Sequence, residues 1–418
     1  MAYSAAARVV APAVVVTPGI TAMQRGLLWL AGVSGGVVII EPSPYELVIV
    51  AALAFFVVTG LRMRTAFLPL MILLFLVNIG YTICAAYLMD QSRIVNWILT
   101  SWYLTISALF FAMVFAEDTL GRIRFLQSGL MLAALIASLA AVAGYFHLVP
   151  GRPEAFTLYN RAAGTFKDPN VLGAFLILPG LFALQSVLSD PFGKAARNAI
   201  LFGLISLAVL LSFSRAAWGQ LVFTSAMLLF LTYVTSPSPT QRARLIILAV
   251  IGVAVAAFAI AVLLSFDSIG NLFKERASLE QSYDSGRFGR FGRYVLGAQM
   301  ALDLPLGIGP LQFTKFFPED THNSYLNAFM SGGWISGICF PALTFTTVIL
   351  GFRHVFIRVP WQRWYLAVFT AFLGTVGESF IIDIDHWRHF WMMLGIMWGM
   401  FAATWQHVAA PVPDLADR

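Results

Sequence analysis

The chain has 418 residues, of which 59% are hydrophobic and only 11% are charged, and its mean hydropathy is +0.82. Soluble domains carry roughly a quarter charged residues, so the composition excludes an ordinary soluble protein. It indicates a polytopic membrane protein with a formal net charge of +6.

Apolar runs long enough to cross about 30 Å of hydrocarbon recur along the chain. We therefore expect an all-α transmembrane bundle of about twelve helices, which forms a single integral-membrane domain over residues 23–406. The expected spans lie near residues 24–40, 45–62, 66–88, 95–116, 125–148, 171–188, 198–213, 216–234, 245–265, 333–352, 363–382 and 389–406. Residues 1–22 lack the order of a signal peptide, so we expect cytoplasmic tails at 1–22 and 407–418.

The orientation follows from the basic residues, because short cytoplasmic loops carry the excess of Lys and Arg. Alternate loops contain Arg62 and Arg64, Arg122 and Arg124, Lys194 and Arg197, Arg242 and Arg244, and Arg353, Arg358 and Arg363. With an even number of spans, both termini lie on that side, which we take as the cytoplasm. Cys84 and Cys339 fall in predicted spans, and we expect neither a disulfide nor a metal site.

Three outer segments break the charge rule: residues 151–170, residues 212–219 and a large loop over residues 266–321. Their cations include Arg152, Arg161, Lys167, Arg215, Lys274, Arg276, Arg287, Arg290, Arg293 and Lys315. A translocated loop can escape the rule and an arginine can reach the interface from a helix end, but Arg215 has almost no loop around it. An anionic ligand is the alternative, and the planar fork of arginine suits a diphosphate.

The large loop is expected to contain a surface helix. Asp284 or Ser285 could cap it, after which Phe288, Phe291, Val295 and Met300 share an apolar face while Arg287, Arg290, Arg293 and Tyr294 present polar ends. The sequence PLGIGP, residues 305–310, then turns the chain back. The next stretch, THNSYLNAFMSGGWISG, places His322 and Asn323 before an apolar run, where Asn323 could simply cap the next helix.

Four motifs in order resemble the O-antigen ligase and polymerase superfamily of bacterial inner-membrane polysaccharide enzymes. They are NRAAGTFKDPNVLGAFL (160–176), LSFSRAAWG (211–219), SGRFGRFGRYVLGAQMALDLPLGIGPLQF (285–313) and THNSYLNAFMSGGWISG (321–337). HWRHFWMMLGIMWG (386–399) also looks like the closing segment of such proteins. The resemblance covers a core region at residues 150–334, and the earlier residues resemble the family only in being apolar helices.

The resemblance implies glycosyl transfer on the periplasmic face of the bacterial inner membrane, from a polyprenyl diphosphate-linked glycan and without a metal or other cofactor. Arg215 matches the arginine of the family's Ser-Arg bend and His322 matches the histidine of its large loop. Among the three arginines before the turn, Arg290 is favoured as the third catalytic residue. The implied substrate-binding residues are Arg161, Lys167, Asn170, Arg287, Arg293, Asn323 and Glu378.

The residue types also suit this chemistry on physical grounds. Arginines stabilise the charge that develops on a departing diphosphate, and a neutral imidazole can take the proton of the attacking hydroxyl. His322 is then the base, oriented by Glu319 or Asp320, and Glu378 could pair with Arg215. His386 and His389 lie in a final outer turn that could line the acceptor entrance.

Several alternatives stay open at the level of sequence. The acceptor could be lipid A core, a second lipid-linked repeat unit or a protein, and the motifs do not separate a ligase from a polymerase. A flippase for the same lipid-linked glycan is the alternative from another class, although the paired broken helices typical of transporters are not evident. Membrane lipids and polysaccharide-assembly proteins are further expected partners, and no nucleic acid is expected.

Overall fold

The structure is a computed structural model that describes residues 17–152, 154–277 and 286–409. These residues form fourteen α-helices and one two-stranded hairpin, which confirms the all-α fold class. The helices are α1 (Pro18–Ser34), α2 (Pro44–Thr59), α3 (Leu68–Ala85), α4 (Ser92–Phe115), α5 (Thr119–Tyr145), α6 (Pro169–Ser189), α7 (Phe192–Leu211), α8 (Arg215–Thr235), α9 (Pro239–Leu264), α10 (Asp267–Ala277), α11 (Arg290–Asp303), α12 (Ser324–His354), α13 (Gln362–Glu378) and α14 (Arg388–Ala409). The strands are β1 (Thr157–Leu158) and β2 (Arg161–Ala162), which pair antiparallel.

Eight helices of the described residues are long and apolar enough to cross a membrane. They are α3 with its flanking 3-10 turns, α4, α5, α6, α7, α8, α9 and α12. The other four expected spans correspond to α1, α2, α13 and α14. Of these, α1 and α13 have 17 residues and α2 has 16, slightly short of the roughly 20 that a membrane helix needs. The count of about twelve therefore stays a prediction.

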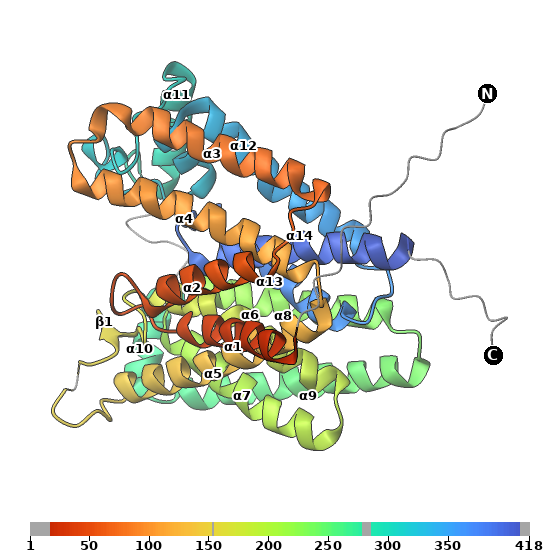
Figure 1. The fold of residues 1–418 in the computed structure, drawn as a ribbon. Helices are drawn as coiled ribbons and strands as arrows, with labels where there is room; N and C mark the ends of the chain where they lie inside the picture. The colour runs from red at the N-terminus through yellow and green to blue at the C-terminus, as the bar shows by residue number, and fades with distance from the viewer. Residues whose placement is uncertain (1–16, 153, 278–285, 410–418) are drawn as a thin grey trace, which may run out of the picture.

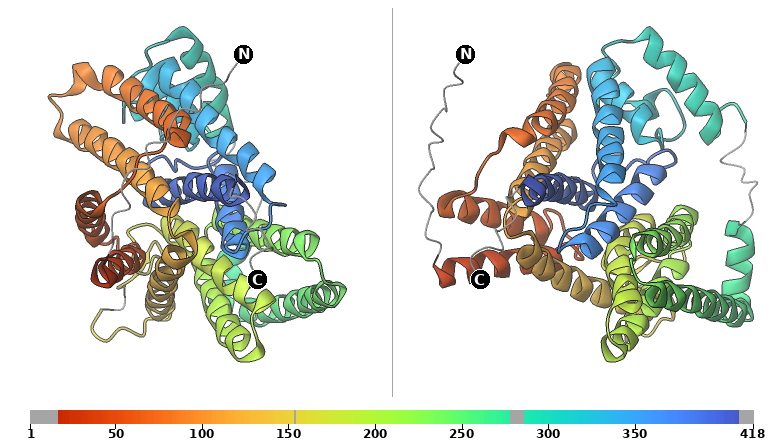
Figure 2. Two further views of the ribbon diagram at one scale, coloured as in Figure 1. Left: turned by 45° about the vertical axis from the view of Figure 1, so that its right-hand side comes forward. Right: turned by 90° about the vertical axis from the view of Figure 1, so that its right-hand side faces the viewer.

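The helices form two groups that are joined by α13 and α14. Figures 1 and 2 show α3, α4, α11 and α12 on one side and α1, α2 and α5 to α9 on the other, with α13 and α14 between them. The packing agrees with this picture, because α14 contacts α4, α12 and α13, while α13 also contacts α6 and α8. The core is rich in phenylalanine, including Phe110, Phe111, Phe372 and Phe390, which are all fully buried.

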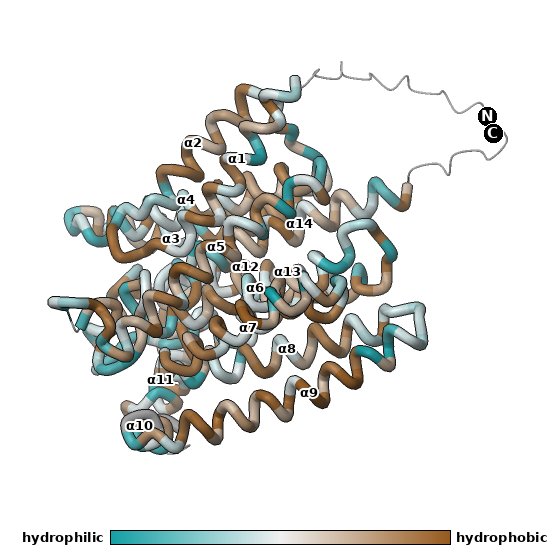
Figure 3. Tube along the Cα trace, turned by 90° about the horizontal axis from the view of Figure 1, so that it is seen from below, coloured by the Kyte–Doolittle hydropathy of each residue, from teal (hydrophilic) through white to brown (hydrophobic). Residues whose placement is uncertain are grey.

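Helix α9 lies at the edge of the bundle and has apolar residues on every side. Only 6% of its most apolar window is buried within the protein, and Figure 3 shows it hydrophobic along most of its length. Val253 and Phe258 are among its exposed side chains. A helix that is hydrophobic all round and unburied requires an apolar solvent, so α9 faces lipid.

The three basic outer segments predicted from sequence gather at one end of the bundle, which we call the His322 end. The β1–β2 hairpin, α10 and α11 all lie toward this end, at the left of Figure 1. The opposite end contains the basic loops that the sequence assigns to the cytoplasm, with the ion pairs Arg25–Asp118 and Arg363–Asp190. Which end faces the periplasm stays a prediction.

We expect the two ends to differ in accessibility from outside the cell. In a background without Cys84 and Cys339, a cysteine at the exposed Thr314 of the His322 end should react with an impermeant thiol reagent added to intact spheroplasts. A cysteine at the exposed Thr240, at the start of α9, should react only after lysis. Equal labelling of both positions in intact spheroplasts would contradict the predicted orientation.

Helix α12 is broken at Gly333, and the PLGIGP turn fills the break. Gly333 has φ 61° and ψ −160°, a conformation that favours glycine. At the break, the N–H groups of Ile308 and Gly309 both donate to the carbonyl of Met330, and Trp334 donates its N–H to the carbonyl of Pro305. The apolar run from residue 333 predicted only the second part of this helix, because a polar first turn and the break precede it.

Helix α11 confirms the expected helix in the large loop, but it begins at Arg290 after the N-cap Gly289. The proposed caps Asp284 and Ser285 lie outside the described residues. Phe291 and Val295 of the predicted apolar face are exposed, and Phe288 is exposed just before the helix. Met300 does not share this face, because it packs on the buried cluster that contains Ala301 and Phe313. The prediction for Arg293 is wrong: its side chain does not present a polar end at the surface but is buried against α12, beside Gly297 and Ala301.

Candidate active site

The turn before α12 is organised around the carboxyl group of Asp383, in the connection from α13 to α14. Its Oδ1 accepts hydrogen bonds from the Thr321 hydroxyl and from the Asn323 N–H, both at 2.9 Å. Its Oδ2 accepts the His322 N–H at 2.9 Å and lies 3.9 Å from His322 Nδ1. Asp383 therefore fixes three consecutive residues of the candidate catalytic turn.

The backbone of His322 itself has an uncommon conformation. Its φ is +47°, in the left-handed region that non-glycine residues seldom occupy. Such conformations persist where the surroundings determine them, and they cluster at functional sites. Here the Asp383 carboxylate and the Tyr294 hydroxyl, which donates to the His322 carbonyl at 2.8 Å, hold the residue on both sides.

The protonation of this turn is set by burial and by the charges around it. Burial lowers the pKa of His322, Arg290 and Arg293 lower it further, and Glu319 and Asp320 act in the opposite direction. Burial also raises the pKa of Asp383 to about 8, assisted by the carboxylates of Asp385 and Asp320, while the hydrogen bonds from Thr321 and from the His322 N–H act in the opposite direction. The imidazole is therefore neutral near pH 7 and able to accept a proton.

Asp383 holds the backbone of the His322 turn, a role for which the sequence singled out no residue. Glu319 instead binds Arg293, and Asp320 accepts the N–H of Thr321. Sequence reasoning missed Asp383 because it lies 61 residues from His322 along the chain. The one available signal is the DIDH run at residues 383–386, which places two carboxylates in an outer turn between apolar helices.

The three arginines before the turn have different environments. Arg293 is 1% exposed, and its guanidinium donates to Glu319 at 2.8 Å and to the Phe288 carbonyl at 3.2 Å. Arg287 is exposed and lies over the ring of Phe288. Arg290, the first residue of α11, is close enough to His322 to lower its pKa. This geometry favours Arg290 and Arg287 over Arg293 for contact with a substrate.

The start of α8 is a second organised turn at the His322 end. Ser214 caps the helix by accepting the Ala217 N–H, and Arg215 is its first residue. The Arg161 side chain lies across this turn, since its Nε donates to the Ser212 carbonyl at 2.7 Å and its Nη2 donates to Asn170 Oδ1 at 2.8 Å. Arg161 and Asn170 thus support the bend that presents Arg215.

Two other predicted binding residues have structural partners. Asn323 caps α12 by accepting the Leu326 N–H at 3.0 Å, and its Nδ2 donates to the Phe380 carbonyl. The capping role considered for Asn323 is therefore confirmed. Glu378 is buried at the end of α13. The Gln220 amide is oriented so that its Nε2 donates to Glu378 Oε2 at 2.9 Å and its oxygen accepts from Thr375.

The end of α13 connects the two turns. It meets α8 through Glu378 and Gln220, which is five residues after Arg215. It meets the His322 turn through the Ser379 carbonyl, which accepts the Ser324 N–H at 2.9 Å. Arg215, Arg290 and His322, which are far apart in the sequence, therefore belong to three elements that lie together at one end of the protein.

Residues 200–340 match the family model described as O-antigen ligase. The resemblance to the O-antigen ligase superfamily is thereby confirmed. This O-antigen ligase segment includes all three residues that the sequence proposed as catalytic. It extends from α7 into α12, whereas the sequence predicted a core region at 150–334, so Arg161, Lys167, Asn170 and Glu378 lie outside the match. No curated protein matches the chain.

We expect Asp383→Asn to lower transfer by about tenfold and to destabilise the folded protein. An amide nitrogen accepts no hydrogen bond, so one of the turn's partly buried N–H groups loses its partner, at a cost of about 1–3 kcal/mol. Initial rates and thermal unfolding of the purified variant measure both effects. Asp303→Asn, at the exposed end of α11, is the control. Reduced stability with an unchanged rate would limit Asp383 to a structural role.

Proposed function

We propose that the protein transfers a glycan from a polyprenyl diphosphate carrier to an acceptor glycan or lipid, at the periplasmic face of the bacterial inner membrane. Transfer proceeds with inversion at the anomeric carbon and without a metal ion. The observation that carries this proposal is the joint position of Arg215, Arg290 and His322. These residues come from three separate parts of the O-antigen ligase segment, and α13 and α11 bring them to one end of the bundle.

The proposed reaction is a direct displacement. An acceptor hydroxyl attacks the anomeric carbon of the donor sugar, and a new C–O bond forms as the bond from that carbon to the diphosphate oxygen breaks. The electron pair of the broken bond remains on the diphosphate. The hydroxyl proton passes to the neutral imidazole of His322, whose lowered pKa keeps it unprotonated at neutral pH.

The arginines supply the electrostatic part of the mechanism. The leaving diphosphate gains negative charge in the transition state, and fixed cations aimed at it lower the barrier. Arg215 at the start of α8 and Arg290 at the start of α11 take this role in the proposal. Each also lies at a helix N-terminus, where the backbone N–H groups favour an anion.

The proposal covers both a ligase and a repeat-unit polymerase, because both use the same donor and the same chemistry. The acceptor is then lipid A core in the first case and a second lipid-linked glycan in the second. A flippase would bind the same diphosphate, but it needs no residue that accepts a proton beside it. The neutral imidazole of His322, on a turn whose backbone Asp383 holds, therefore favours a transferase.

A reconstitution experiment tests this function directly. Purified protein in phospholipid vesicles, given donor lipid and acceptor but no ion gradient, should form the transferred glycan and release polyprenyl diphosphate. The reaction should survive EDTA, since no group of three or more His, Cys, Asp and Glu residues in the described parts of the chain could hold a metal. Movement of the donor across the bilayer without product would favour the flippase. Loss of activity that magnesium restores would refute the metal-free mechanism.

A further inference from the structure

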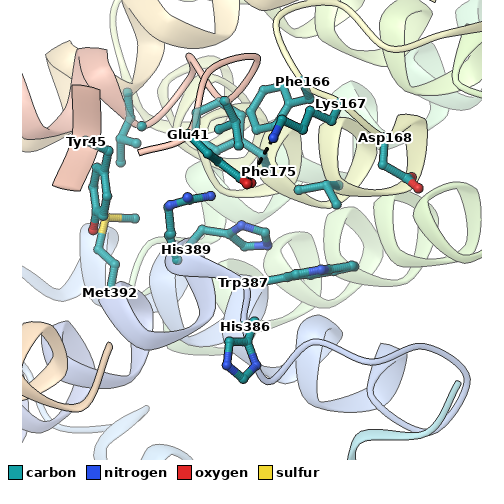
Figure 4. Close-up of a pocket in the computed structure, with 15 residues that line it drawn as sticks. Glu41, Tyr45, Phe166, Lys167, Asp168, Phe175, His386, Trp387, His389 and Met392 are labelled. Atoms are coloured by element: carbon teal, nitrogen blue, oxygen red, sulfur yellow. Dashed lines mark ion pairs between the residues drawn. The ribbon is translucent and has the colours of Figure 1, made fainter. Parts of the chain in front are cut away.

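A pocket at the His322 end is lined in part by the α13–α14 connection. It has a volume of about 150 Å³ and is lined by the α1–α2 connection, the residues before α6 and the start of α14. Figure 4 shows the pair Glu41 and Lys167 on one side of this pocket and the rings of Trp387 and His389 on the other. The same connection carries Asp383, so this pocket and the His322 turn share one loop.

The pocket has the size and the walls to hold a single ring. A cavity of about 150 Å³ lined by apolar side chains can hold a molecule as large as benzene. Here the walls are aromatic: Trp387, Phe166 and Phe175 all line it and are all buried. The rings of Phe166 and Phe175 are packed together, with their centroids 5.0 Å apart. Flat aromatic faces suit a ligand with an apolar face of its own.

Both cations that line the pocket, Lys167 and Arg388, are already paired with carboxylates, which argues against an anionic ligand. Lys167 Nζ lies 3.0 Å from Glu41 Oε2, and Arg388 is paired with Glu46. An anion would have to compete with a carboxylate for each cation. A neutral ligand can instead use both members of an ion pair, because hydroxyl groups donate to carboxylates and accept from ammonium groups.

One buried polar atom in the wall also needs a partner. His389 is 8% exposed, its ring lies near those of Trp387 and Phe175, and its Nε2 makes no hydrogen bond within the described structure. Buried polar atoms are nearly always hydrogen-bonded. A hydroxyl group in the pocket can satisfy either tautomer of this ring, since it both donates and accepts.

We propose that this pocket binds one neutral sugar ring of the glycan substrate. The C–H face of the sugar packs on the aromatic walls, and its hydroxyls bond to Glu41, Lys167 and His389. The identity of the ligand as part of a glycan substrate rests on the proposed function, but the binding chemistry does not. Lys167, which the sequence placed among the substrate-binding residues, thereby contacts a sugar and not the diphosphate.

A binding assay without donor lipid tests the pocket separately from transfer. The full chain is placed in phospholipid nanodiscs, free of sugar-based detergent, and saturation-transfer NMR is recorded with methyl glycosides of neutral hexoses. We expect saturable binding that Glu41→Gln, Lys167→Gln and Trp387→Leu each weaken by about tenfold. Glu41 and Lys167 are about half exposed, so their variants should fold normally. Lys194→Gln, at the opposite end of the bundle, should bind as the parent does.

The outcomes for the pocket and for the transferase are distinguishable. His322→Gln should keep glycoside binding even where transfer is lost, so failure of transfer leaves the pocket proposal intact. In the transfer assay, Glu41→Gln should raise the KM of either the donor or the acceptor, and this identifies the glycan that enters. The proposal fails if no neutral glycoside binds, if the three variants bind as the parent does, or if neither KM changes.

Discussion

His322→Gln should lower the rate of glycan transfer by about a hundredfold or more while donor binding persists. Glutamine retains hydrogen-bonding capacity but cannot take a proton, and general base catalysis contributes roughly 10²–10⁴-fold. The turn itself should survive, because Asp383 holds it through backbone N–H groups that the substitution does not remove. Transfer and donor-lipid binding are measured on the same purified variant.

His407→Gln is the matched control for this experiment, since it makes the same change at an exposed position near the end of α14. Near-normal transfer by His322→Gln would remove the catalytic role. Loss of donor binding together with transfer would make His322 a ligand of the diphosphate.

The pH profile gives an independent test of the same residue. Burial and Arg290 lower the pKa of His322 below its usual value near 6.5, so the rate should fall with acidity only below that pH. Replacing Arg290 by glutamine removes a positive charge and should move this acidic limb to higher pH. An acidic limb that stays at the same pH in Arg290→Gln would contradict the assignment of the base.

Arg215→Lys should lose most activity even though the charge is kept. The guanidinium fork can donate paired hydrogen bonds to two phosphate oxygens, whereas an ammonium acts as a point charge. Loss of one charge-assisted hydrogen bond costs about 1.5–3 kcal/mol, or about ten- to a hundredfold in kcat/KM. The helix should still form, because Ser214 caps α8 and remains unchanged.

Arg62→Lys, an exposed arginine at the opposite end of the bundle, controls for the substitution itself. Steady-state kinetics at equal levels of purified protein provide the comparison. Full turnover by Arg215→Lys would reduce Arg215 to an anchor at the membrane interface.

Composition and periodicity predicted most of the fold, because a long apolar run has few structural alternatives to a membrane helix. They also predicted the helix at Arg290 and the turn after it. The boundaries were less certain where polar residues begin a helix: α12 starts at Ser324, well before the apolar run, because Asn323 caps it and the PLGIGP turn supports its first part. No pattern in a single sequence reports that kind of tertiary support.

The candidate site was predictable where one residue carries the chemistry and unpredictable where two distant segments meet. Arg215 and His322 stand in recognisable motifs, and both lie at the His322 end. The partnership of His322 with Asp383 joins α12 to the α13–α14 connection, and the burial of Arg293 depends on which face of α11 meets α12. Both depend on packing, so periodicity alone gave the correct helix but the wrong environment for Arg293.

The break at Gly333 anchors the C-terminal part of the large loop to α12. The PLGIGP turn is fastened to α12 by three backbone hydrogen bonds, and Tyr294 fastens α11 to the His322 carbonyl. These contacts, together with those that Asp383 makes to the His322 turn, set the spacing of Arg290 and His322. The chain between α9 and α11 can then change in length and sequence, for instance to suit another acceptor, without a change in the distance between the candidate base and its neighbouring cation.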